Sequence, residues 1–365
     1  MKSYLNKLQL VPPCLILGLL FFSACGKKGP LVAPVKKIPK GAQAAAVHQQ
    51  GGTAVLIWRN PAAYIDGSPL EALDKIEIYA ARSSIEESPS GISAGVFREK
   101  AVLLETIPQD NLDEYAYPEN PALQSYRYSF DLDDINKAQL AFAIKIYDGR
   151  GKASEFSDPV SLAPATVPRP PQELKVKAEP AGVGLSWEPP EENINGTTPA
   201  LAQGYNIYKK IEDEPVVRIN RNPVTEAEFQ DTAIEWGVTY TYWVRASVSA
   251  ASLYPESEDS DSAVITPEDT FPPEPPEGLT ALAGGGFVAL SWRAPRISDL
   301  QGYRVWRRKE GEDKYTVLTQ EPIREASYTD NAAESSVKYH YQVTALDTAG
   351  NESGRSEAVA VTVRK

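Results

Sequence analysis

The sequence predicts an all-β protein made of three tandem antiparallel β-sandwiches. A short strand pattern that contains a tryptophan and stops just before a proline occurs three times, at Trp58, Trp187 and Trp292. In the last two copies, valine, leucine and tryptophan alternate with small or polar residues, which is typical of a strand with one face in a core. The chain has 365 residues, a length that suits about two or three domains.

The composition agrees with a β-rich, acidic protein. The 18 tyrosines and six tryptophans suit pleated surfaces, because aromatic side chains pack well there. The formal net charge is −12, and it would be −14 without Lys2 and Lys7. Phosphate backbones repel such a chain, so we expect no nucleic-acid partner.

Few residues in this chain are suited to catalysis or to metal binding. Both cysteines, Cys14 and Cys25, lie within the first 25 residues, so the rest of the chain has no disulfide framework and no cysteine metal site. Only His48 and His340 could act as bases near neutral pH. The sequence contains no Ser–His–Asp order, P-loop or dinucleotide fingerprint. We therefore expect a protein that is not an enzyme, with no catalytic residue, cofactor or metal.

Two acidic runs are candidates for a metal site. Residues 131–134 and 256–261 are the densest clusters of carboxylates. Calcium takes six to eight oxygen ligands, but neither run has the spacing and glycine of a defined calcium loop. We interpret both runs as solvated loop charges.

Residues 1–24 are expected to be a signal peptide. Lys2 and Lys7 precede an apolar segment over 15–22, which is too short for a bilayer span of about 20 residues. Ser23 and Ala24, directly before Cys25, resemble the bacterial lipoprotein box. That resemblance implies cleavage before Cys25 and a lipid on Cys25, which would attach the chain to a membrane. An ordinary signal peptide or an uncleaved anchor is the alternative.

The residues that follow Cys25 suggest a cellular location and a flexible tether. Residues 25–31, CGKKGPL, resemble the start of small lipoproteins that assist lipopolysaccharide export, and Gly26 is compatible with sorting to the outer membrane. Residues 25–43 are rich in lysine, proline and glycine and lack periodicity, which indicates a flexible tether. Its lysines could contact anionic head groups.

From about residue 44, the spacing of several residues repeats. An aspartate precedes a late strand by nine residues in each copy, at Asp131, Asp231 and Asp330. After the first and third copies, an aspartate, a glycine and two serines recur at the same offsets, over 148–157 and 347–356.

Together with the tryptophan strands, this pattern resembles the fibronectin type III family. The resemblance covers residues 44–165, 168–269 and 274–365, and it implies three immunoglobulin-like sandwiches of seven strands and about 100 residues each. Trp58, Trp187 and Trp292 would lie in the three cores. Leu140 replaces the tyrosine that the family pattern has at the start of the late strand, so we expect the tyrosine-corner hydrogen bond only in the second and third copies.

The first copy carries an insertion. Tyr79 and Asp131 are 52 positions apart, whereas the corresponding residues of the second copy, Tyr208 and Asp231, are 23 positions apart. Val55 and Ile57 are apolar on the face that is serine or glycine elsewhere, so we expect that outer face to be covered, with the insertion as the candidate cover. Our hypothesis is that the first domain carries the partner-specific surface; the alternative is a longer solvated loop.

Glycine and proline mark the turns and the joints. Asp66–Gly67 and Asn195–Gly196 are tight-turn signals in corresponding loops. Proline-rich residues 164–171 and 272–276 separate the domains and predict short, stiff joints in a rod-like string.

These features lead to a functional hypothesis with two alternatives. The chain would be a lipid-anchored protein of the bacterial cell envelope, at the outer membrane on its periplasmic face or at the surface. Its tandem domains would bind or space a protein or glycan partner, since loops on a rigid scaffold often carry such contacts. The first alternative is an accessory factor in outer-membrane or lipopolysaccharide-transport assembly. The second is an accessory subunit of a carbohydrate-active enzyme.

Overall fold

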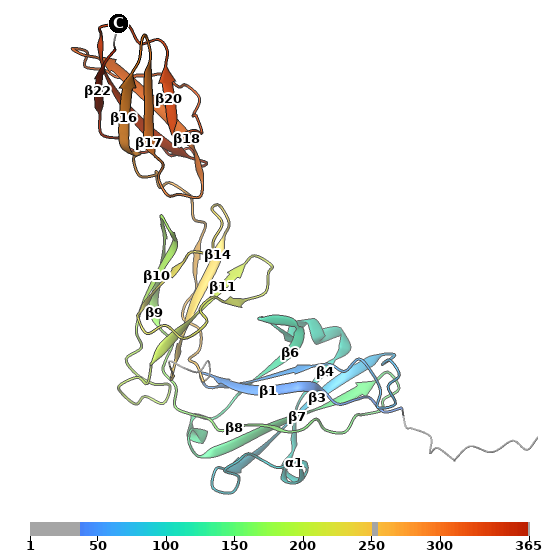
Figure 1. The fold of residues 1–365 in the computed structure, drawn as a ribbon. Helices are drawn as coiled ribbons and strands as arrows, with labels where there is room; N and C mark the ends of the chain where they lie inside the picture. Colours follow the sequence, from blue (N-terminus) through green and yellow to red (C-terminus); the bar gives the residue numbers. More distant parts are fainter. Residues whose placement is uncertain (1–36, 250–254, 364–365) are drawn as a thin grey trace, which may run out of the picture.

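The computed structural model describes residues 37–249 and 255–363 (Figure 1). The expected signal peptide over 1–24, the lipid-attachment residue Cys25 and most of the expected tether lie outside the described residues. Among the helices within those two ranges, none has the length and apolar character needed to cross a membrane.

The described chain forms three antiparallel β-sandwiches, as the sequence predicts (Figure 1). Six sheets pair into three bodies, and in each body some connections join neighbouring strands of one sheet while others cross to the opposite sheet. The fold is all-β and fibronectin type III-like.

The first sandwich packs two four-stranded sheets against each other, so it has eight strands where we expected seven. One sheet has the order β1 (Gln43–Gln50), β2 (Thr53–Arg59), β6 (Asn120–Ser129), β5 (Ala116–Tyr117). The other has the order β4 (Val102–Pro108), β3 (Leu73–Ser84), β7 (Ala138–Asp148), β8 (Val160–Leu162). The helical segments are α1 (Ala94–Lys100), η1 (Gln109–Tyr115) and η2 (Leu132–Asp134).

The second and third sandwiches each pair a three-stranded with a four-stranded sheet, which gives the expected seven strands. In the second, β9 (Gln172–Glu179), β10 (Gly182–Glu188) and β13 (Glu228–Asp231) face β12 (Val217–Arg218), β11 (Gly204–Ile211), β14 (Tyr240–Ser247) and β15 (Ala263–Ile265). In the third, β16 (Glu277–Ala283), β17 (Val288–Arg293) and β20 (Ser327–Asp330) face β19 (Thr316–Val317), β18 (Leu300–Lys309), β21 (Lys338–Asp347) and β22 (Val359–Thr362).

The three tryptophans lie in the cores, as predicted. Trp58 is 0% exposed, Trp187 5% and Trp292 7%. Trp187 meets the ring of Tyr205 edge-on at 5.2 Å between centroids, and Trp292 meets Tyr303 at the same distance. Large buried rings supply much of the apolar area of a domain that has no disulfide.

The repeated aspartate has a structural role in two of the three copies. The Tyr242 hydroxyl donates to Asp231 over 2.8 Å, and Lys209 pairs with the same carboxylate at 2.8 Å. In the third sandwich, Tyr341 and Arg307 bind Asp330 in the same way, each at 2.8 Å. In the first, phenylalanine stands at the tyrosine position, and the exposed aspartate caps η2 instead.

The tyrosine corner follows the sequence as expected. The hydroxyl of Tyr240 accepts a hydrogen bond from the backbone N–H of Glu235 at 2.6 Å, and that of Tyr339 accepts from Glu334 at 3.2 Å. Leu140, at the corresponding position of the first sandwich, is 2% exposed and has no hydroxyl to offer.

The paired serines take the place of part of the last strand in all three sandwiches. Ser257 Oγ accepts from the backbone N–H of Ala246 at 2.8 Å, while the Ser257 N–H donates to the Ala246 carbonyl at 2.8 Å. Ser260 makes the same two hydrogen bonds with the backbone N–H and carbonyl of Val244, each at 3.0 Å. The same pairs of bonds are made by Ser154, Ser157, Ser353 and Ser356.

The insertion covers a face of the first sandwich, but not the face that we expected. Phe97 of α1 is 0% exposed and packs in a cluster with Ala81 of β3 and with Ala141 and Ala143 of β7. Helix α1 therefore covers the outer face of the β4–β3–β7–β8 sheet, whereas Val55 belongs to the opposite sheet. The first half of the insertion is thus part of the packed domain rather than a solvated loop.

Both glycine turns form as predicted. The N–H of Gly67 donates to the Tyr64 carbonyl at 3.0 Å, and that of Gly196 donates to the Asn193 carbonyl at 2.9 Å. The φ angles are +85° at Gly67 and +76° at Gly196, a conformation that glycine adopts at no steric cost.

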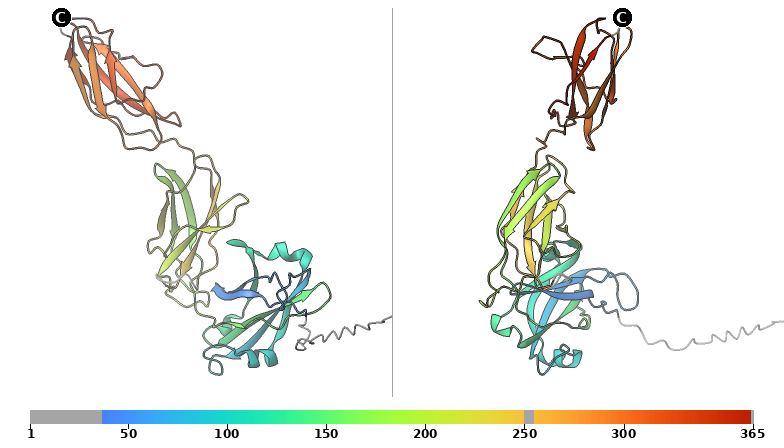
Figure 2. Two further views of the ribbon diagram at one scale, coloured as in Figure 1. Left: turned by 45° about the vertical axis from the view of Figure 1, so that its right-hand side comes forward. Right: turned by 60° about the vertical axis from the view of Figure 1, so that its left-hand side comes forward.

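The expected rod is bent at its first joint. The second and third sandwiches lie end to end, but the strands of the first run across the foot of the second (Figures 1 and 2). Proline-rich joints alone therefore do not set the shape of the molecule.

Residues 37–43, which we assigned to the flexible tether, contact the first sandwich. Lys37 pairs with Glu71 at 2.7 Å. The N–H of Lys40 donates to the Ala63 carbonyl at 3.1 Å, and the Ile38 carbonyl accepts from Ile65 at 2.9 Å. These backbone bonds extend the ordered domain toward the N-terminus by several residues.

Replacing a core tryptophan should destabilise one sandwich only. We expect Trp187→Ala to cost the second sandwich about 3–5 kcal/mol of unfolding free energy, because it leaves a large cavity. Trp236→Ala, at a half-buried position, should change it by about 1 kcal/mol or less. Chemical denaturation followed by circular dichroism measures both; equal losses in the two variants would contradict the core assignment.

Candidate functional site

The second sandwich covers the outer face of the β1–β2–β6–β5 sheet. The Thr53 hydroxyl donates to Glu258 at 3.2 Å, and Arg127 pairs with the same carboxylate at 3.0 Å. Val55, which alternates with Thr53 along β2, is only 3% exposed. The outer face of β2 at Thr53 is therefore part of an interface between two domains, and the buried Val55 lies beside it.

Backbone hydrogen bonds also join the two domains. The N–H of Gly51 donates to the Glu256 carbonyl at 2.8 Å, and the N–H of Glu256 donates to the Gln49 carbonyl at 3.2 Å. Gly51 has a φ of +56°, and a Cβ on it would lie 2.4 Å from the Glu258 side chain. The turn between β1 and β2 thus needs glycine both for its conformation and for the close approach of the second sandwich.

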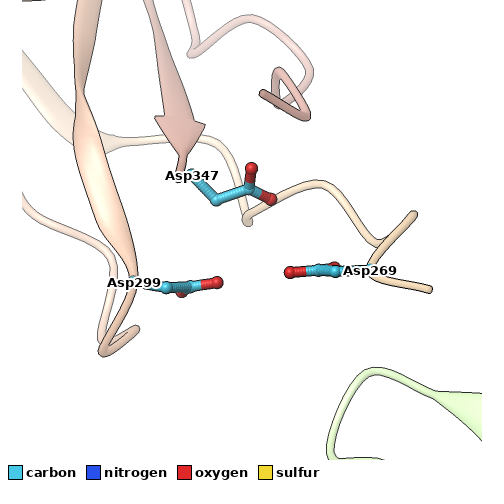
Figure 3. Close-up of side chains that lie close together, drawn as sticks. All are labelled: Asp269, Asp299 and Asp347. Atoms are coloured by element: carbon cyan, nitrogen blue, oxygen red, sulfur yellow. The ribbon is translucent and has the colours of Figure 1, made fainter. Parts of the chain in front are cut away.

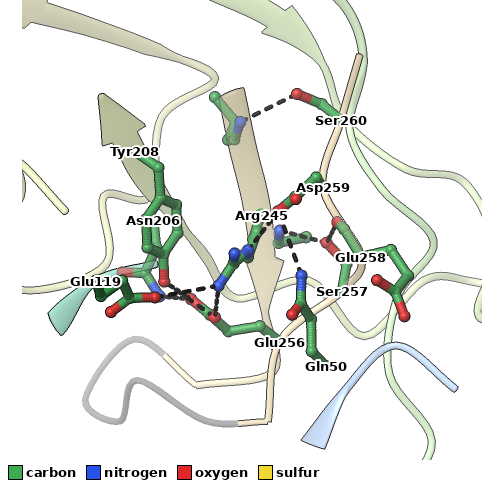
Figure 4. A network of polar contacts seen from close by, with 12 residues as sticks. Gln50, Glu119, Asn206, Tyr208, Arg245, Glu256, Ser257, Glu258, Asp259 and Ser260 are labelled. Carbon is green, nitrogen blue, oxygen red and sulfur yellow. Dashed lines mark hydrogen bonds and ion pairs between the residues drawn. The ribbon is translucent and has the colours of Figure 1, made fainter. Parts of the chain in front are cut away.

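A buried arginine forms the centre of this junction (Figure 4). Arg245, on the outer face of β14, pairs with Glu256 at 3.2 Å and with Asp259 at 2.6 Å. Its guanidinium lies 4.1 Å from the centroid of the Tyr208 ring. Glu256 is 0% exposed and also accepts from the Tyr208 hydroxyl at 2.9 Å and from the Asn206 amide.

The interpretation of residues 256–261 as solvated loop charges is therefore wrong. Glu256 is fully buried, and Glu258 and Asp259 contact the first sandwich. The other run is also partly structural, because Asp134 is 5% exposed and pairs with Arg82. Four carboxylates of these runs thus have partners within the chain: Asp134, Glu256, Glu258 and Asp259.

The second half of the insertion reaches the same junction. Glu119 lies 3.8 Å from Arg245, and the N–H of Val216 in the second sandwich donates to the Pro118 carbonyl at 2.9 Å. Part of the insertion thus contacts a partner within the chain, and this contact helps to fix the angle between the first two domains.

The electrostatics of the junction follow from its burial. Burial raises the pKa of Glu256, while Arg245 opposes that rise. Burial by itself would lower the pKa of Arg245, but attraction to the neighbouring phenol and carboxylates outweighs it, and the pKa lies above its usual value. A buried ion pair of this kind is costly to form but much more costly to break from one side.

His48 lies at the edge of the same junction. Burial, together with repulsion from Arg245 and Arg127, lowers the pKa of His48 to about 4. The imidazole is therefore neutral in the folded protein at pH 7. His340, the other histidine, pairs with Glu310 in the third sandwich.

The second junction contains a cleft between the second and third sandwiches. Its volume is about 1120 Å3, and its lining includes Trp236, Phe271 and the proline-rich joint. The rings of Trp236 and Phe271 lie 6.0 Å apart, tilted by 44°.

Three carboxylates converge at the edge of this cleft (Figure 3). Asp269, Asp299 and Asp347 each offer an oxygen within 4.8 Å of the others. Carboxylate oxygens suit hard cations, but Asp347 already accepts from Asn351, at 2.8 Å from the backbone N–H and 2.9 Å from the side-chain amide. That amide also donates to the Asp269 carbonyl at 3.1 Å, so the group acts as a hydrogen-bonded joint between two domains.

Only some of these residues are indicated by sequence patterns. Asp347 opens a repeated motif, yet the motif does not indicate that Asp269 and Asp299 lie beside it. Arg245 occupies an outward-facing position of a predicted strand. In an acidic protein, such a position suggests a solvated charge rather than a buried one. Cys25, the predicted lipid-attachment residue, lies outside the described residues.

The fold and the two junctions define a multidomain β-sandwich protein with fibronectin type III-like modules. No protein-family model matches the chain. It is similar to exoglucanase B of Cellulomonas fimi, with 29% identity over 238 residues, which are 61% of this chain and 20% of the exoglucanase. It is also similar to amylopullulanase of Thermoanaerobacter thermohydrosulfuricus (28% identity; 40% of this chain, 10% of the relative) and to striated-muscle M-protein of Gallus gallus (24%; 63% and 16%).

The similar region thus spans about a fifth or less of these curated relatives. Among solved structures, the FN1–FN3 domains of chicken CNTN1 match over 90% of this chain and 99% of that one, with 16% identity and a TM-score of 0.26. A two-domain fibronectin type III segment of chicken tenascin matches over 53% and 99%, with 17% identity and a TM-score of 0.36.

Removing Arg245 should be far more damaging than removing the whole ion pair. We expect Arg245→Met to lower the unfolding free energy by about 3–5 kcal/mol, because Glu256 stays buried without its cation. The double variant R245M/E256Q should recover most of that loss. Denaturation measures the stability, and small-angle scattering measures the angle between the domains.

The control is Arg221→Met, at an exposed position of the same sandwich, which should change stability by about 0.5 kcal/mol or less. A double variant that is as unstable as Arg245→Met alone would show that the buried pair is not the source of the effect.

Acid should weaken the folded protein through His48. Its folded pKa of about 4 lies below the ordinary value of 6.5, so the unfolded chain binds the proton more readily. Stability from this group is therefore fully present above pH 6.5 and falls as the pH drops toward 4, by about 3 kcal/mol in all. His48→Gln should flatten the stability profile in that range when unfolding is measured at half-unit pH steps; unchanged slopes would contradict the assignment.

Proposed function

We propose that this chain is a lipid-anchored protein of the bacterial cell envelope that holds a binding surface at a distance from the membrane. Cys25 carries the lipid, and residues 26–36 connect it to the first sandwich. The role is binding and spacing rather than catalysis. The membrane is the outer membrane, as the residues after Cys25 suggest by resemblance.

The observation that carries this proposal is the fixed junction between the first two sandwiches. A module that only occupied space would gain nothing from a defined bend, yet the Arg127–Glu258 and Glu119–Arg245 ion pairs join the two domains beside the buried Arg245–Glu256 pair. The third sandwich then continues the line of the second (Figure 2). Such an arrangement presents the third sandwich in a set direction relative to the anchored end.

A glycan-related role is the second candidate, and the comparisons support it. Exoglucanase B, amylopullulanase and the α-amylase of Niallia circulans, which is 26% identical over 67% of this chain, are named for polysaccharide-degrading activities. The matched region is a minor part of each. We therefore carry over an accessory role toward a glycan, and not the activity itself. A role in lipopolysaccharide-transport assembly rests on residues 25–31 alone.

The anchor is tested by exchanging each cysteine in turn. We expect Cys25→Ala to abolish incorporation of an alkyne-labelled fatty acid and to release the protein from washed membranes of the producing bacterium. Cys14→Ala, a matched change within the leader, should keep both the label and the membrane association. Retention of label and membrane by the Cys25→Ala protein would overturn the lipid anchor.

A pull-down from detergent-solubilised membranes distinguishes the partners. Recovery of lipopolysaccharide-export components would favour the assembly role over a spacer role. Turnover of a polysaccharide by the purified protein would contradict a purely binding function.

A further inference from the structure

The third sandwich has an outer sheet face that differs from its counterparts. Along β18, Arg304, Trp306 and Arg308 alternate with residues of the core, so they share the outer face of the β19–β18–β21–β22 sheet. Tyr315, just before β19, and Arg355, between β21 and β22, complete the cluster through ring contacts. We call these five residues the arginine–aromatic face.

The same face is covered in the other two sandwiches. The serine hydrogen bonds align Phe156, Asp259 and Arg355, each of which directly precedes the second serine. Phe156 packs against Phe97 of α1 at 5.5 Å between centroids, and Asp259 contacts Gln50 of the first sandwich. No other domain of the described chain packs over this face in the third sandwich (Figures 1 and 2).

The arginines of the face are held in place by aromatic rings. The Arg355 guanidinium lies 4.4 Å from the Trp306 ring and 5.1 Å from the Tyr315 ring. The Arg308 guanidinium lies 5.3 Å from the centroid of the Tyr315 ring and donates to the Glu312 carbonyl at 3.1 Å. Trp306 is itself fixed by donating from Nε1 to the Thr344 hydroxyl at 3.1 Å. Stacking of this kind orders a guanidinium without using its hydrogen-bond donors on a carboxylate.

Two of the three arginines keep their charge available. Arg304 pairs with Glu352, and Lys338 and His340 beside the face both pair with Glu310. Arg308 and Arg355 form no ion pair with any residue over 37–249 or 255–363. In a chain of net charge −12, two unpaired guanidinium groups on one face make a local site for an anion.

We propose that the arginine–aromatic face binds an anionic saccharide chain, one that carries carboxylate, sulfate or phosphate groups. Guanidinium forks match these oxyanions bidentately, and stacking on the half-buried Trp306 and Tyr315 rings orients the two guanidinium groups in advance. Charge complementarity selects the anion, and guanidinium groups held at fixed positions favour the regularly spaced charges of a stiff saccharide chain over a flexible acidic peptide. This inference rests on the proposed binding function and gives it a ligand class.

The test uses the full chain in detergent and four probes: dextran sulfate, polygalacturonate, uncharged dextran and poly-glutamate. At about 0.15 M salt, where long-range attraction is screened, we expect the protein to bind the two anionic polysaccharides and to ignore dextran. The variant R308Q/R355Q should bind them at least about tenfold more weakly, which is the loss expected for two charge-assisted contacts. Trp306→Phe should weaken binding less.

The matched control is R296Q/R324Q, which removes the same charge from two exposed positions outside this face. It should bind within about twofold of the unchanged protein, because only the general field is altered. Equal losses in both double variants, or binding to dextran sulfate alone with no dependence on Arg308 and Arg355, would overturn the proposal.

Poly-glutamate binding without polysaccharide binding would assign the face to an acidic protein and would also overturn it. None of these outcomes depends on Cys25, so failure here leaves the anchor and the spacer role to their own test.

Discussion

The junction between the first two domains is built around one buried cation. Arg245 stands on a strand of the second sandwich, but its partners include the loop that carries Glu256 and a residue of the first-domain insertion. Removed from water, each charge is stable only in the presence of the other. The first sandwich contacts this network through Glu119, and it also pairs Arg127 with Glu258, so these contacts hold the first two sandwiches together in addition to the proline-rich segment that connects them.

The equivalent outer sheet face has a different environment in each of the three sandwiches. The first sandwich covers it with α1, the second uses it to dock the first, and in the third it remains open. Small changes at equivalent positions accompany these outcomes, with phenylalanine, aspartate and arginine before the second serine. Divergence between repeats is thus concentrated on a surface, while the indole, the core strands and the serine hydrogen bonds stay constant.

The sequence was sufficient for the fold because its main signals are local. Alternation around Trp187 and the serine spacing after Gly350 depend only on residues near them in the chain. The site was harder to predict because its residues are joined over long separations. Gln50 and Asp259 are 209 positions apart, and no pattern in either segment shows that they meet. Val55 and Ile57 did indicate a covered face, but not that a second domain covers it.

The serine pairs bear on how three similar β-sandwiches coexist in one chain. Because Ser257 and Ser260 already occupy backbone groups of β14, the last strand β15 shrinks to Ala263–Ile265. The first and third sandwiches end in comparably short strands, Val160–Leu162 and Val359–Thr362. Short terminal edges give a neighbouring repeat little to pair with. At that edge, each sandwich of the tandem chain therefore offers a neighbouring repeat little backbone for domain swapping or edge-to-edge aggregation.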